Sequence, residues 1–386
     1  MEPQLSERPS LSVLNTGIVV GFPALCALLV PLYVWHYGLT WFHLWVFLSL
    51  WWVTGLGITA GYHRLFSHRS YQASTLLKVF FAMTGAAACQ NSILEWSEDH
   101  RHHHRSVDTD RDPYNAKRGF WWSHVGWVLF DDSLTRQRTM TDDLGRDPLC
   151  QWQHTYYLHL AIGFNVLVPL CVGLLVGDAL GALLFGGLVR IVMVHHFTFF
   201  INSLAHIWGR QPWSRSNTSR DNWLLSLLTL GEGYHNYHHA FQTDYRNGPK
   251  WYNFDPTKWL IWSCSRVGLA GRLSRVPLER RWKKRFEETR GELRRLFDER
   301  SEVDWAQLVG AEQRLEAALG LLQQARYAYR ELLERKKQEG ERVVSAVQEA
   351  KQAWKEQKRQ VRQALEVWEQ AIAELAGPEL GLGAYS

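Results

Sequence analysis

Four long apolar segments limit most strongly what this chain can fold into. They span residues 11–35, 41–62, 156–176 and 179–204. Each is about as long as the roughly 20 residues that a helix needs to cross a bilayer. Only a few residues separate the members of each pair, so we predict two transmembrane hairpins. A further apolar run at 76–88 is too short to cross, and we expect it to lie at the membrane interface.

The distribution of charge predicts the orientation of these segments. Lys and Arg concentrate between the second and third segments and after the fourth, which places both regions and both termini in the cytoplasm. The net charge of +5 gives no reason to expect nucleic acid binding. The five cysteines form no Cys-x-x-Cys pair and are typical of a reducing compartment. Since residues 1–10 also lack the basic start of a signal peptide, we expect a bacterial inner membrane.

Three histidine clusters lie next to the predicted spans. HRLFSH contains His63 and His68, and two further stretches place histidines at i, i+3 and i+4: His100, His103, His104 and His235, His238, His239. Residues at these spacings share one helix face. Neutral imidazole is a common ligand of iron, copper, nickel and zinc, and eight imidazoles exceed the needs of one ion. The clusters therefore predict a site for two metal ions.

The first cluster poses a geometric problem. Residues at i and i+5 lie about 140° apart on an ideal helix, so His63 and His68 require either a distorted turn or two metals approached from different sides. All three clusters fall on the predicted cytoplasmic side. We therefore expect an all-α integral membrane protein whose four transmembrane helices, in two hairpins, are capped by a cytoplasmic helical domain with a metal pair.

The last third of the chain differs in character. Residues 276–302 form a basic amphipathic pattern that would suit either a helix on anionic headgroups or a solvated helix. Residues 303–386 carry sevenfold apolar spacing, which favours a coiled-coil-like tail, and Gly340 is expected to divide it into an antiparallel hairpin. We expect this tail to serve self-association or docking. The predicted domains are 1–275, 276–302 and 303–386.

Five motifs together resemble the membrane fatty acid desaturases, most closely the stearoyl-CoA (Δ9) branch. They are GITAGYHRLFSHRSY at 57–71, EWSEDHRHHH at 95–104, DPYNAKRGFWWSHVGW at 112–127, NSLAHIWG at 202–209 and GEGYHNYHHAF at 231–241. The resemblance covers residues 12–269. It implies a non-haem di-iron enzyme that uses O₂ and two electrons to introduce a cis double bond, at Δ9, into an acyl chain on CoA or membrane lipid.

The resemblance also implies the site residues. The family's nine histidine ligands and one water-mediated asparagine ligand correspond to His63, His68, His100, His103, His104, His206, His235, His238, His239 and Asn202. The implied substrate contacts are Asn91, Asp99, Phe199, Trp51 and Gly55. No catalytic side chain beyond the metal ligands is implied. Trp51 is expected either to close the acyl tunnel early or to pack against lipid.

Other polar residues receive structural interpretations. His102 is expected to face solvent or support the cluster, and His195 to lie in the core or beside the ligands. We expect Arg190, inside the fourth segment, to form a buried ion pair. Glu232 precedes His235 by three residues, as in carboxylate-bridged di-iron bundles, but no second Glu-x-x-His occurs here. The carboxylate-bridged architecture is therefore rejected.

The chain departs from the acyl-CoA pattern at acidic positions. Glu98, Asp131 and Asp132 stand where that branch has basic contacts to the CoA phosphates. A polyanion would be repelled there, which favours an acyl-phospholipid or another carrier. The alternative is that Lys117, Arg118 and Arg136 hold a thioester from other positions.

Two further alternatives stay open. A hydroxylase on the same di-iron platform would show the same clusters. A metal transporter or storage protein is disfavoured, because its ligands should lie near mid-membrane. Since the sequence shows no haem, flavin or iron–sulfur motif, we expect a separate electron donor of the ferredoxin, rubredoxin or cytochrome b5 type with its reductase.

Overall fold

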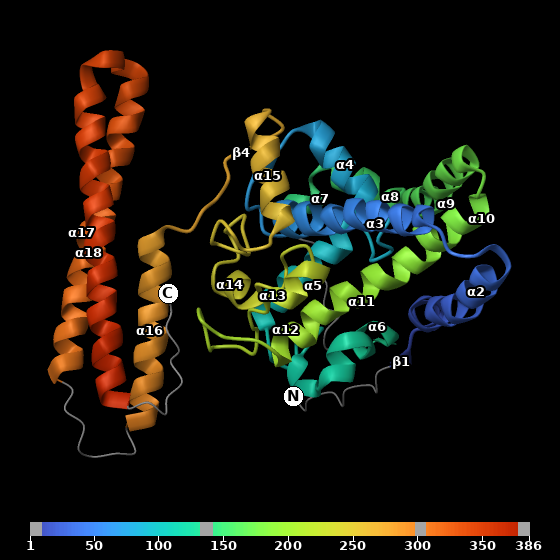
Figure 1. Ribbon diagram of the computed structural model, residues 1–386, viewed down its shortest axis with the longest axis horizontal. Coiled ribbons are helices and arrows are strands. Elements are labelled where there is room, and N and C mark those ends of the chain that lie inside the picture. Colours follow the sequence, from blue (N-terminus) through green and yellow to red (C-terminus); the bar gives the residue numbers. More distant parts are fainter. Residues whose placement is uncertain (1–9, 132–141, 298–305, 377–386) are drawn as a thin grey trace, which may run out of the picture. The chain divides into compact units, whose positions relative to one another are not determined.

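The computed structural model describes residues 10–131, 142–297 and 306–376. The chain divides into two compact units, Met1–Val276 and Pro277–Ser386 (Figure 1). The first unit contains the apolar segments and all the histidine clusters. The second contains the helical tail.

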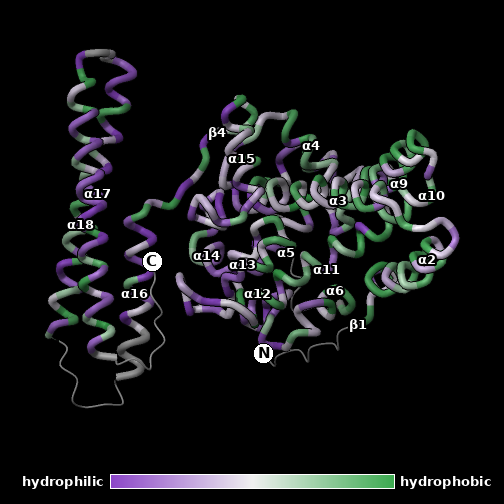
Figure 2. Tube along the Cα trace, viewed as in Figure 1, coloured by the Kyte–Doolittle hydropathy of each residue, from purple (hydrophilic) through white to green (hydrophobic). Residues whose placement is uncertain are grey.

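Four helical segments in the first unit are long and apolar enough to cross a membrane. They are Val13–Tyr37, Trp41–Ser67, Tyr157–Val176 and Ala179–Ile207. Figure 2 shows apolar residues gathered along α2, α3 and α9 within these segments. The predicted starts agree within two residues, whereas the second and fourth segments continue beyond their predicted ends. These extensions carry His63 and His206 on the spans themselves.

Three of the four spans contain π-helical turns. The first comprises α1 (Val13–Thr16), η1 (Gly17–Gly21) and α2 (Phe22–Tyr37); the second, α3 (Trp41–Leu56) and η2 (Gly57–Ser67); the third, α9 (Tyr157–Val176); and the fourth, α10 (Ala179–Ala182), η5 (Leu183–Val189), α11 (Arg190–Asn202) and α12 (Leu204–Ile207). The widened turn of η2 carries the first histidine pair.

The two hairpin turns are joined to each other by hydrogen bonds. Gly38 and Gly177 take positive φ angles of 74° and 85°, which glycine adopts without steric cost. Asp178, in the second turn, accepts from the Tyr33 hydroxyl at 2.6 Å and lies 2.8 Å from Nε2 of His43. The same carboxylate caps α10 through the backbone N–H of Gly181, 2.8 Å away. This cluster therefore fixes one hairpin against the other at the end far from the metal-ligand clusters.

Arg190 connects the spans without a carboxylate partner among the described residues. Its guanidinium donates to the carbonyl oxygens of Ala87 at 2.8 Å and Gly186 at 3.0 Å, and also to Asn165. The predicted ion pair is therefore wrong. The sequence predicted that a single carboxylate would pair with this fully buried cation. Several neutral oxygens accept its hydrogen bonds instead.

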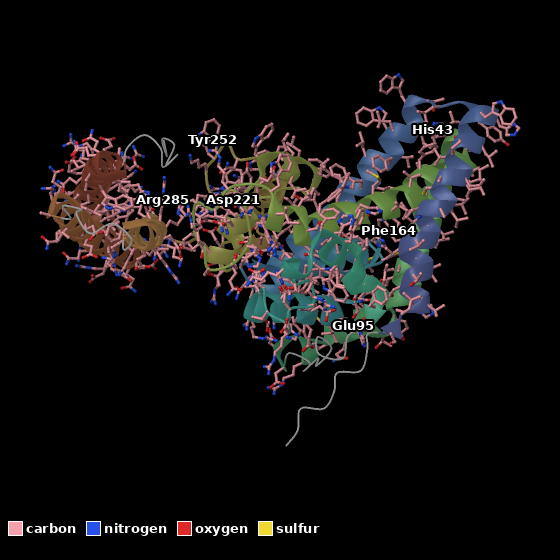
Figure 3. The ribbon with its side chains drawn as sticks, turned by 90° about the horizontal axis from the view of Figure 1, so that it is seen from below. His43, Glu95, Phe164, Asp221, Tyr252 and Arg285 are labelled. Atoms are coloured by element: carbon pink, nitrogen blue, oxygen red, sulfur yellow. The ribbon has the colours of Figure 1, made fainter. Side chains whose placement is uncertain are left out.

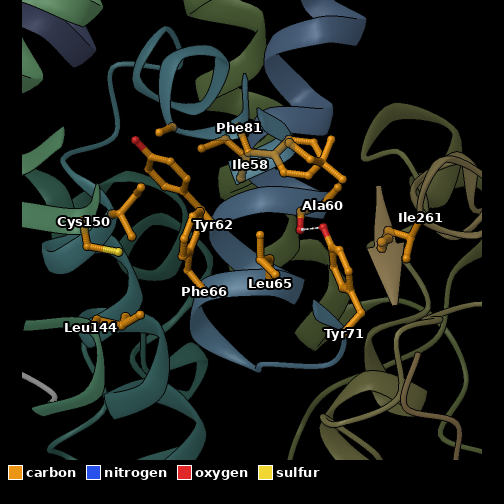
Figure 4. Packing of buried hydrophobic residues seen from close by; sticks show 14 of the residues in the cluster. Ile58, Ala60, Tyr62, Leu65, Phe66, Tyr71, Phe81, Leu144, Cys150 and Ile261 are labelled. Atoms are coloured by element: carbon orange, nitrogen blue, oxygen red, sulfur yellow. Dashed lines mark hydrogen bonds between the residues drawn. The ribbon is translucent and has the colours of Figure 1, made fainter. Parts of the chain in front are cut away.

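The short apolar helix α4 (Thr75–Ala86) packs closely against η2. A Cβ added at Gly61 would lie 2.6 Å from the Cβ of Phe81, so the two helices approach through glycine. Figure 4 shows this core, in which the Tyr71 hydroxyl donates to the carbonyl of Ala60 at 2.8 Å. The outer face of α4 stays exposed at Leu76 and Phe80. This arrangement agrees with a helix that is too short to span.

Shorter elements complete the first unit around the ends of the spans. The helices are α5 (Ile93–Ser106), η3 (Ala116–Arg118), η4 (Trp122–Gly126), α6 (Trp127–Leu129), α7 (Asp142–Gly145), α8 (Pro148–Thr155), α13 (Trp223–Leu228), α14 (His235–Ala240) and α15 (Pro256–Arg266). Two antiparallel strand pairs connect distant segments: β1 (Ser10–Leu11) with β3 (Phe130–Asp131), and β2 (Gln72–Ala73) with β4 (Ala270–Gly271).

The second unit is a helical hairpin with one additional helix. Its elements are α16 (Leu278–Phe297), α17 (Ala306–Glu339), η6 (Gly340–Val343) and α18 (Val344–Ala376). Gly340 takes a φ of +61° at the reversal between the two long helices. The Phe286 ring of α16 is 1% exposed and lies 5.2 Å from the Trp368 ring. Phe286 and Trp282 of α16 therefore pack within their own unit. The sequence had also allowed a helix lying on headgroups.

Candidate metal centre and substrate cavity

Nine histidines converge in the first unit and divide into two groups. Within each group, one ring nitrogen from every member lies within 4.8 Å of those of all the others. Group one contains His63, His68, His100, His104 and His238. Group two contains His103, His206, His235 and His239. Each group is therefore arranged to hold one metal ion.

In group one, the Nε2 atoms point toward one another. The Nε2 atoms of His68 and His100 are 2.8 Å apart, and that of His238 lies 3.0 Å from His63 and 2.9 Å from His104. Metal–nitrogen bonds of roughly 2.1 Å at right angles would place two ligands about 3 Å apart. The spacing is thus suited to a shared ion.

The π-helical turn η2 explains how His63 and His68 belong to the same group. The backbone N–H of His68 donates to the carbonyl of His63 at 3.0 Å, an i to i+5 hydrogen bond. The wider turn brings the two rings to 4.8 Å between centroids. Of the two geometries that the sequence allowed, the distorted turn is the one observed.

Group two is built from three different segments. The Nε2 atom of His235 lies 3.1 Å from that of His206 and 3.0 Å from that of His239, and His103 lies 3.3 Å from His239. The i, i+4 pair His235 and His239 stays in this group, while His238 faces group one. Helix α5 contributes to both groups as well: His100 and His104 belong to group one and His103 to group two. Helices α5 and α14 therefore each supply ligands to both groups.

The outer ring nitrogens of three of these histidines meet oxygen atoms. Nδ1 of His63 lies 2.9 Å from Oε2 of Glu232, and Nδ1 of His103 lies 2.8 Å from Oδ1 of Asp112. Nδ1 of His206 lies 2.8 Å from the hydroxyl of Thr218. Such partners fix the tautomer that leaves Nε2 free to bind a metal.

Sequence reasoning did not identify these three orienting residues. Glu232 lies in the GEGYHNYHH motif and Asp112 opens the DPYN motif, so their positions beside histidine clusters were the available signal. Since Glu232 faces His63 and Arg64, it takes no place in either metal group. The rejection of a carboxylate-bridged centre agrees with this geometry.

Arg64 extends the network away from group one. Its guanidinium donates to Oε1 of Glu232 at 2.8 Å and lies 3.0 Å from a carboxylate oxygen of Asp255. All three side chains are buried. Burial opposes ionisation of Glu232, but Arg64 and His63 hold its pKa below the ordinary value.

The electrostatics of the groups favour neutral imidazoles. Burial, followed by the neighbouring rings, holds the pKa of five histidines well below the ordinary value of 6.5: His100, His104, His235, His238 and His239. Neutral imidazole is the form that binds metal. The converging nitrogens, the orienting carboxylates and these pKa shifts together fit a pair of nitrogen-ligated transition metal ions.

A cavity of about 370 Å³ adjoins both groups. Its lining includes two imidazoles from each group, together with Asn202 and all the substrate contacts implied by resemblance: Trp51, Gly55, Asn91, Asp99 and Phe199. Asn202 is 9% exposed and is the last residue of α11, four residues before His206. The structure thus brings the metal groups and the candidate acyl contacts together.

The remaining histidines lie outside the two groups. His102 is half-buried, and the ring of His195 lies 2.8 Å from the carbonyl of Ala88 in the cavity wall. His124 contacts His196 at 3.1 Å and the Ser203 hydroxyl at 3.0 Å, where the fourth span breaks between α11 and α12. These contacts agree with packing roles.

The acidic positions that disfavoured CoA have different environments. Glu98 is 4% exposed, so its carboxylate does not present charge to a bound polyanion at the surface. Asp132 and Arg136 lie outside the described residues, as does the side chain of Asp131. Lys117 and Arg118 are exposed, and the Arg118 guanidinium lies 3.2 Å from the centre of the Trp122 ring. Repulsion of the CoA phosphates by Glu98 is therefore no longer an argument against CoA as the acyl carrier.

Comparison with known proteins identifies the family. A sequence model of the family described as fatty acid desaturase matches residues 39–268. The probable acyl-CoA desaturase of Schizosaccharomyces pombe is 50% identical over 226 residues, 58% of this chain and 47% of that protein. Acyl-CoA desaturase 1 of Saccharomyces cerevisiae is 43% identical over 268 residues, 67% of this chain and 51% of that protein.

A third relative is covered almost completely. The sn-1 stearoyl-lipid 9-desaturase of Anabaena variabilis is 35% identical over 269 residues, 69% of this chain and 94% of that protein. The chain spans about half the length of the two yeast relatives. With four helices able to cross a bilayer, it is an integral membrane protein. On this evidence, the chain belongs to the fatty acid desaturase family.

Proposed function

We propose that this protein desaturates acyl chains: it introduces a cis double bond, at Δ9, into a saturated chain carried on CoA or on membrane lipid. The observation that carries the proposal is the convergence of nine imidazoles in two groups beside one cavity with both apolar and polar walls. The names of the relatives, which include acyl-CoA and stearoyl-lipid desaturases, support the same substrate class.

The reaction removes two hydrogens from adjacent methylenes. In balance, CH₂–CH₂, O₂, two electrons and two protons give CH=CH and two waters. Two iron ions, when bound by the nine histidines, with Asn202 as a water-mediated ligand, supply the activation of O₂ that no side-chain acid or base can provide. Glu232, Asp112 and Thr218 hold His63, His103 and His206 in their orientations.

The cavity residues position the substrate. Trp51 and Gly55 lie on α3, in the second span, and Phe199 lies on α11, in the fourth. Asn91 and Asp99 provide polar groups in the same lining. We propose that the apolar part of the cavity holds the acyl chain away from water with its reacting methylenes beside the two groups.

The proposal extends to partners and organisation. The electrons come from a separate carrier of the ferredoxin, rubredoxin or cytochrome b5 type. Residues 1–275 form the desaturase domain, 276–302 a basic amphipathic juxtamembrane segment, and 303–386 a coiled-coil or helical-hairpin extension for self-association or docking of a partner. The positive-inside rule puts the termini and the active site in the cytoplasm. The bacterial inner membrane stays a prediction, since two of the relatives are yeast proteins.

Analysis of membrane lipids tests the proposed reaction. The full chain is expressed beside a double variant, His103→Ala with His104→Ala, which removes one imidazole from each group. Double bonds are then located by mass spectrometry, with stearoyl-CoA supplied to isolated membranes to distinguish the carriers. We expect cis-monounsaturated chains that the variant does not make. Hydroxylated chains would assign the protein to an oxygenase, and unchanged lipids with two bound irons and a competent donor would refute acyl desaturation.

A further inference from the structure

One exposed face of the first unit combines aromatic and basic side chains. We call it the aromatic-basic face and define it by six residues: Lys250, Trp251, Tyr252, Trp259, Trp262 and Arg266. The Trp251 side chain is 85% exposed and Tyr252 is 58% exposed, while the two α15 tryptophans are 43% and 44% exposed. Aromatic and arginine side chains dominate the binding energy of protein interfaces.

Contacts connect the members of this face. The Lys250 ammonium lies 5.6 Å from the centre of the Tyr252 ring, and the Arg266 guanidinium lies 4.8 Å from that of Trp262. Trp262 and Arg266 are four residues apart on α15 and therefore neighbours on its surface. The face thus presents cations beside aromatic rings, and cation–π attraction stabilises these pairs.

The charge exposed here has one sign. Between Tyr245 and Val276 the only acidic residue is Asp255, which is fully buried. Besides Lys250 and Arg266, the exposed charged residues of this stretch are Arg272 and Arg275. An acidic partner would therefore meet complementary charge across the whole face.

Buried polar groups hold the loop that carries Trp251 and Tyr252. Nζ of Lys258 donates to the carbonyl oxygens of Gly248 and Lys250 at 2.7 Å and of Asn253 at 3.0 Å. The Asp255 carboxylate accepts from the backbone N–H of Gly248 at 3.0 Å. A loop fixed in this way loses little conformational freedom when a partner binds.

The same loop connects to the candidate metal centre. The side-chain amide of Asn247 donates to Oε2 of Glu232, the atom that lies 2.9 Å from Nδ1 of His63. Asn247, three residues before Lys250 of the aromatic-basic face, is therefore linked to a group-one imidazole through the Glu232 side chain. A carrier bound to the aromatic-basic face would therefore lie on the side of the candidate metal centre, which its electrons must reach.

The face lies at the end of the first unit that is opposite the two hairpin turns. Tyr252 and His43 lie at opposite ends of the first unit in Figure 3, and His43 sits beside the hairpin turns. Figure 1 likewise places α15 and α14 at the end opposite α10. This end carries α14 of the metal-ligand clusters and is the predicted cytoplasmic side, which a water-soluble carrier domain can reach.

We infer that the aromatic-basic face docks an acidic electron-carrier protein. The inference rests on the proposed function, because that reaction consumes two electrons and two protons per turnover as O₂ is reduced to water. A one-electron carrier would be oxidised at each of two successive encounters. The six residues supply the contact area and the charge, and the fixed loop supplies the geometry.

Binding of two acidic carriers to the iron-loaded full chain in nanodiscs tests this inference. The probes are a [2Fe–2S] ferredoxin and the soluble haem domain of cytochrome b5. We expect at least one of them to bind with a Kd that rises with salt concentration. Lys250→Glu combined with Arg266→Glu should weaken that binding about tenfold or more, and Trp251→Ala by about tenfold. The matched control is Arg146→Glu, which reverses an exposed charge elsewhere on the unit and should leave the Kd unchanged.

A single turnover without a carrier separates this inference from the proposed function: dithionite reduces the iron-loaded protein in the absence of O₂, the excess is removed, and O₂ is then added. The docking variants should keep their iron content and their yield of double bonds in this single turnover, while carrier-driven turnover shows a raised KM for the carrier. If Trp251→Ala fails to fold, the charge-reversal pair carries the test. Equal Kd values for the wild type and the charge-reversal pair, or no salt-dependent binding of either probe, would overturn the inference. A wild type that forms no double bond in the carrier-free single turnover would instead refute the proposed function.

Discussion

Oε2 of Glu232 lies 2.9 Å from Nδ1 of His63, although the two residues belong to different histidine clusters in the sequence. The other carboxylate oxygen accepts from the Arg64 guanidinium at 2.8 Å. Both residues are buried, so the carboxylate joins the π-helical end of the second span to the turn before α14. This contact fixes the position of a group-one imidazole and neutralises a buried cation.

Removal of the Glu232 carboxylate should therefore affect both stability and iron binding. In Glu232→Ala, Arg64 keeps Asp255 as its one carboxylate partner among the described residues. Breaking a buried ion pair costs about 3 kcal/mol or more of unfolding free energy. Loss of the orienting partner of a metal-binding histidine weakens metal affinity roughly 10- to 100-fold. Thermal unfolding and competition with a chelator measure the two effects. Glu331→Ala, at an exposed position, is the control, and equal behaviour of the two variants would contradict this role.

Asp112 makes the corresponding contact in group two. Its Oδ1 atom lies 2.8 Å from Nδ1 of His103, and its other oxygen accepts from the backbone N–H of Asp108 at 2.9 Å. We expect Asp112→Ala to lower the iron content from about two ions per chain toward one, because group one keeps all its contacts. Elemental analysis of purified protein checks this. Asp110→Ala changes an exposed carboxylate two residues away, and equal iron content in both variants would exclude the role of Asp112.

Acid should release the metals and destabilise the fold. The five imidazoles with lowered pKa stay neutral in the folded protein at pH values where the unfolded chain takes up protons. The unfolded state therefore binds more protons below about pH 6.5, so stability falls as the pH falls, by up to about 1.4 kcal/mol per pH unit for each such group. Tm and retained iron between pH 7.5 and 5 measure this. A flat Tm across that range would contradict the neutral-imidazole assignment.

Trp51 is expected to limit the length of the bound acyl chain. It lines the cavity on α3, and its ring packs edge-on against Phe197 with 6.0 Å between centroids. Truncation in Trp51→Ala should extend the cavity and shift the products toward longer chains, as read by mass spectrometry of the lipids. Trp52→Ala changes the adjacent, more exposed tryptophan and serves as the control. An unchanged chain-length distribution in Trp51→Ala would instead favour packing against lipid.

The spans and the histidine clusters could be predicted because their signals are local. Apolar runs of about 20 residues identify the four spans, and the i, i+3, i+4 spacing places His100, His103 and His104 on one face. Their division between two groups could not be predicted in this way. It depends on where α5 and α14 lie relative to each other and on the π-helical turn that brings His63 to His68.

The buried partners of the metal-binding histidines could not be predicted from the sequence for a different reason. Glu232 meets His63 from a segment distant in the chain, whereas Asp112 and Thr218 follow His103 and His206 by 9 and 12 residues, beyond the ends of the helices that carry these histidines. Nothing in their spacing specifies which nitrogen they face. The same reason explains why the partners of Arg190 were wrongly predicted. Its charge suggested a carboxylate, whereas its hydrogen bonds go to neutral oxygens. The amphipathic pattern of α16 likewise indicates an apolar face but not the Trp368 ring that covers Phe286.

The most direct test of the central claim is the number and ligation of iron ions in the purified full chain. Iron analysis combined with X-ray absorption spectroscopy should find two ions per chain with nitrogen and oxygen neighbours at about 2.1 Å and no sulfur. His68→Ala with His100→Ala should remove the ion of group one, and His235→Ala with His239→Ala that of group two. One ion per chain in the wild type, sulfur ligation, or iron content unaffected by both double variants would contradict the claim.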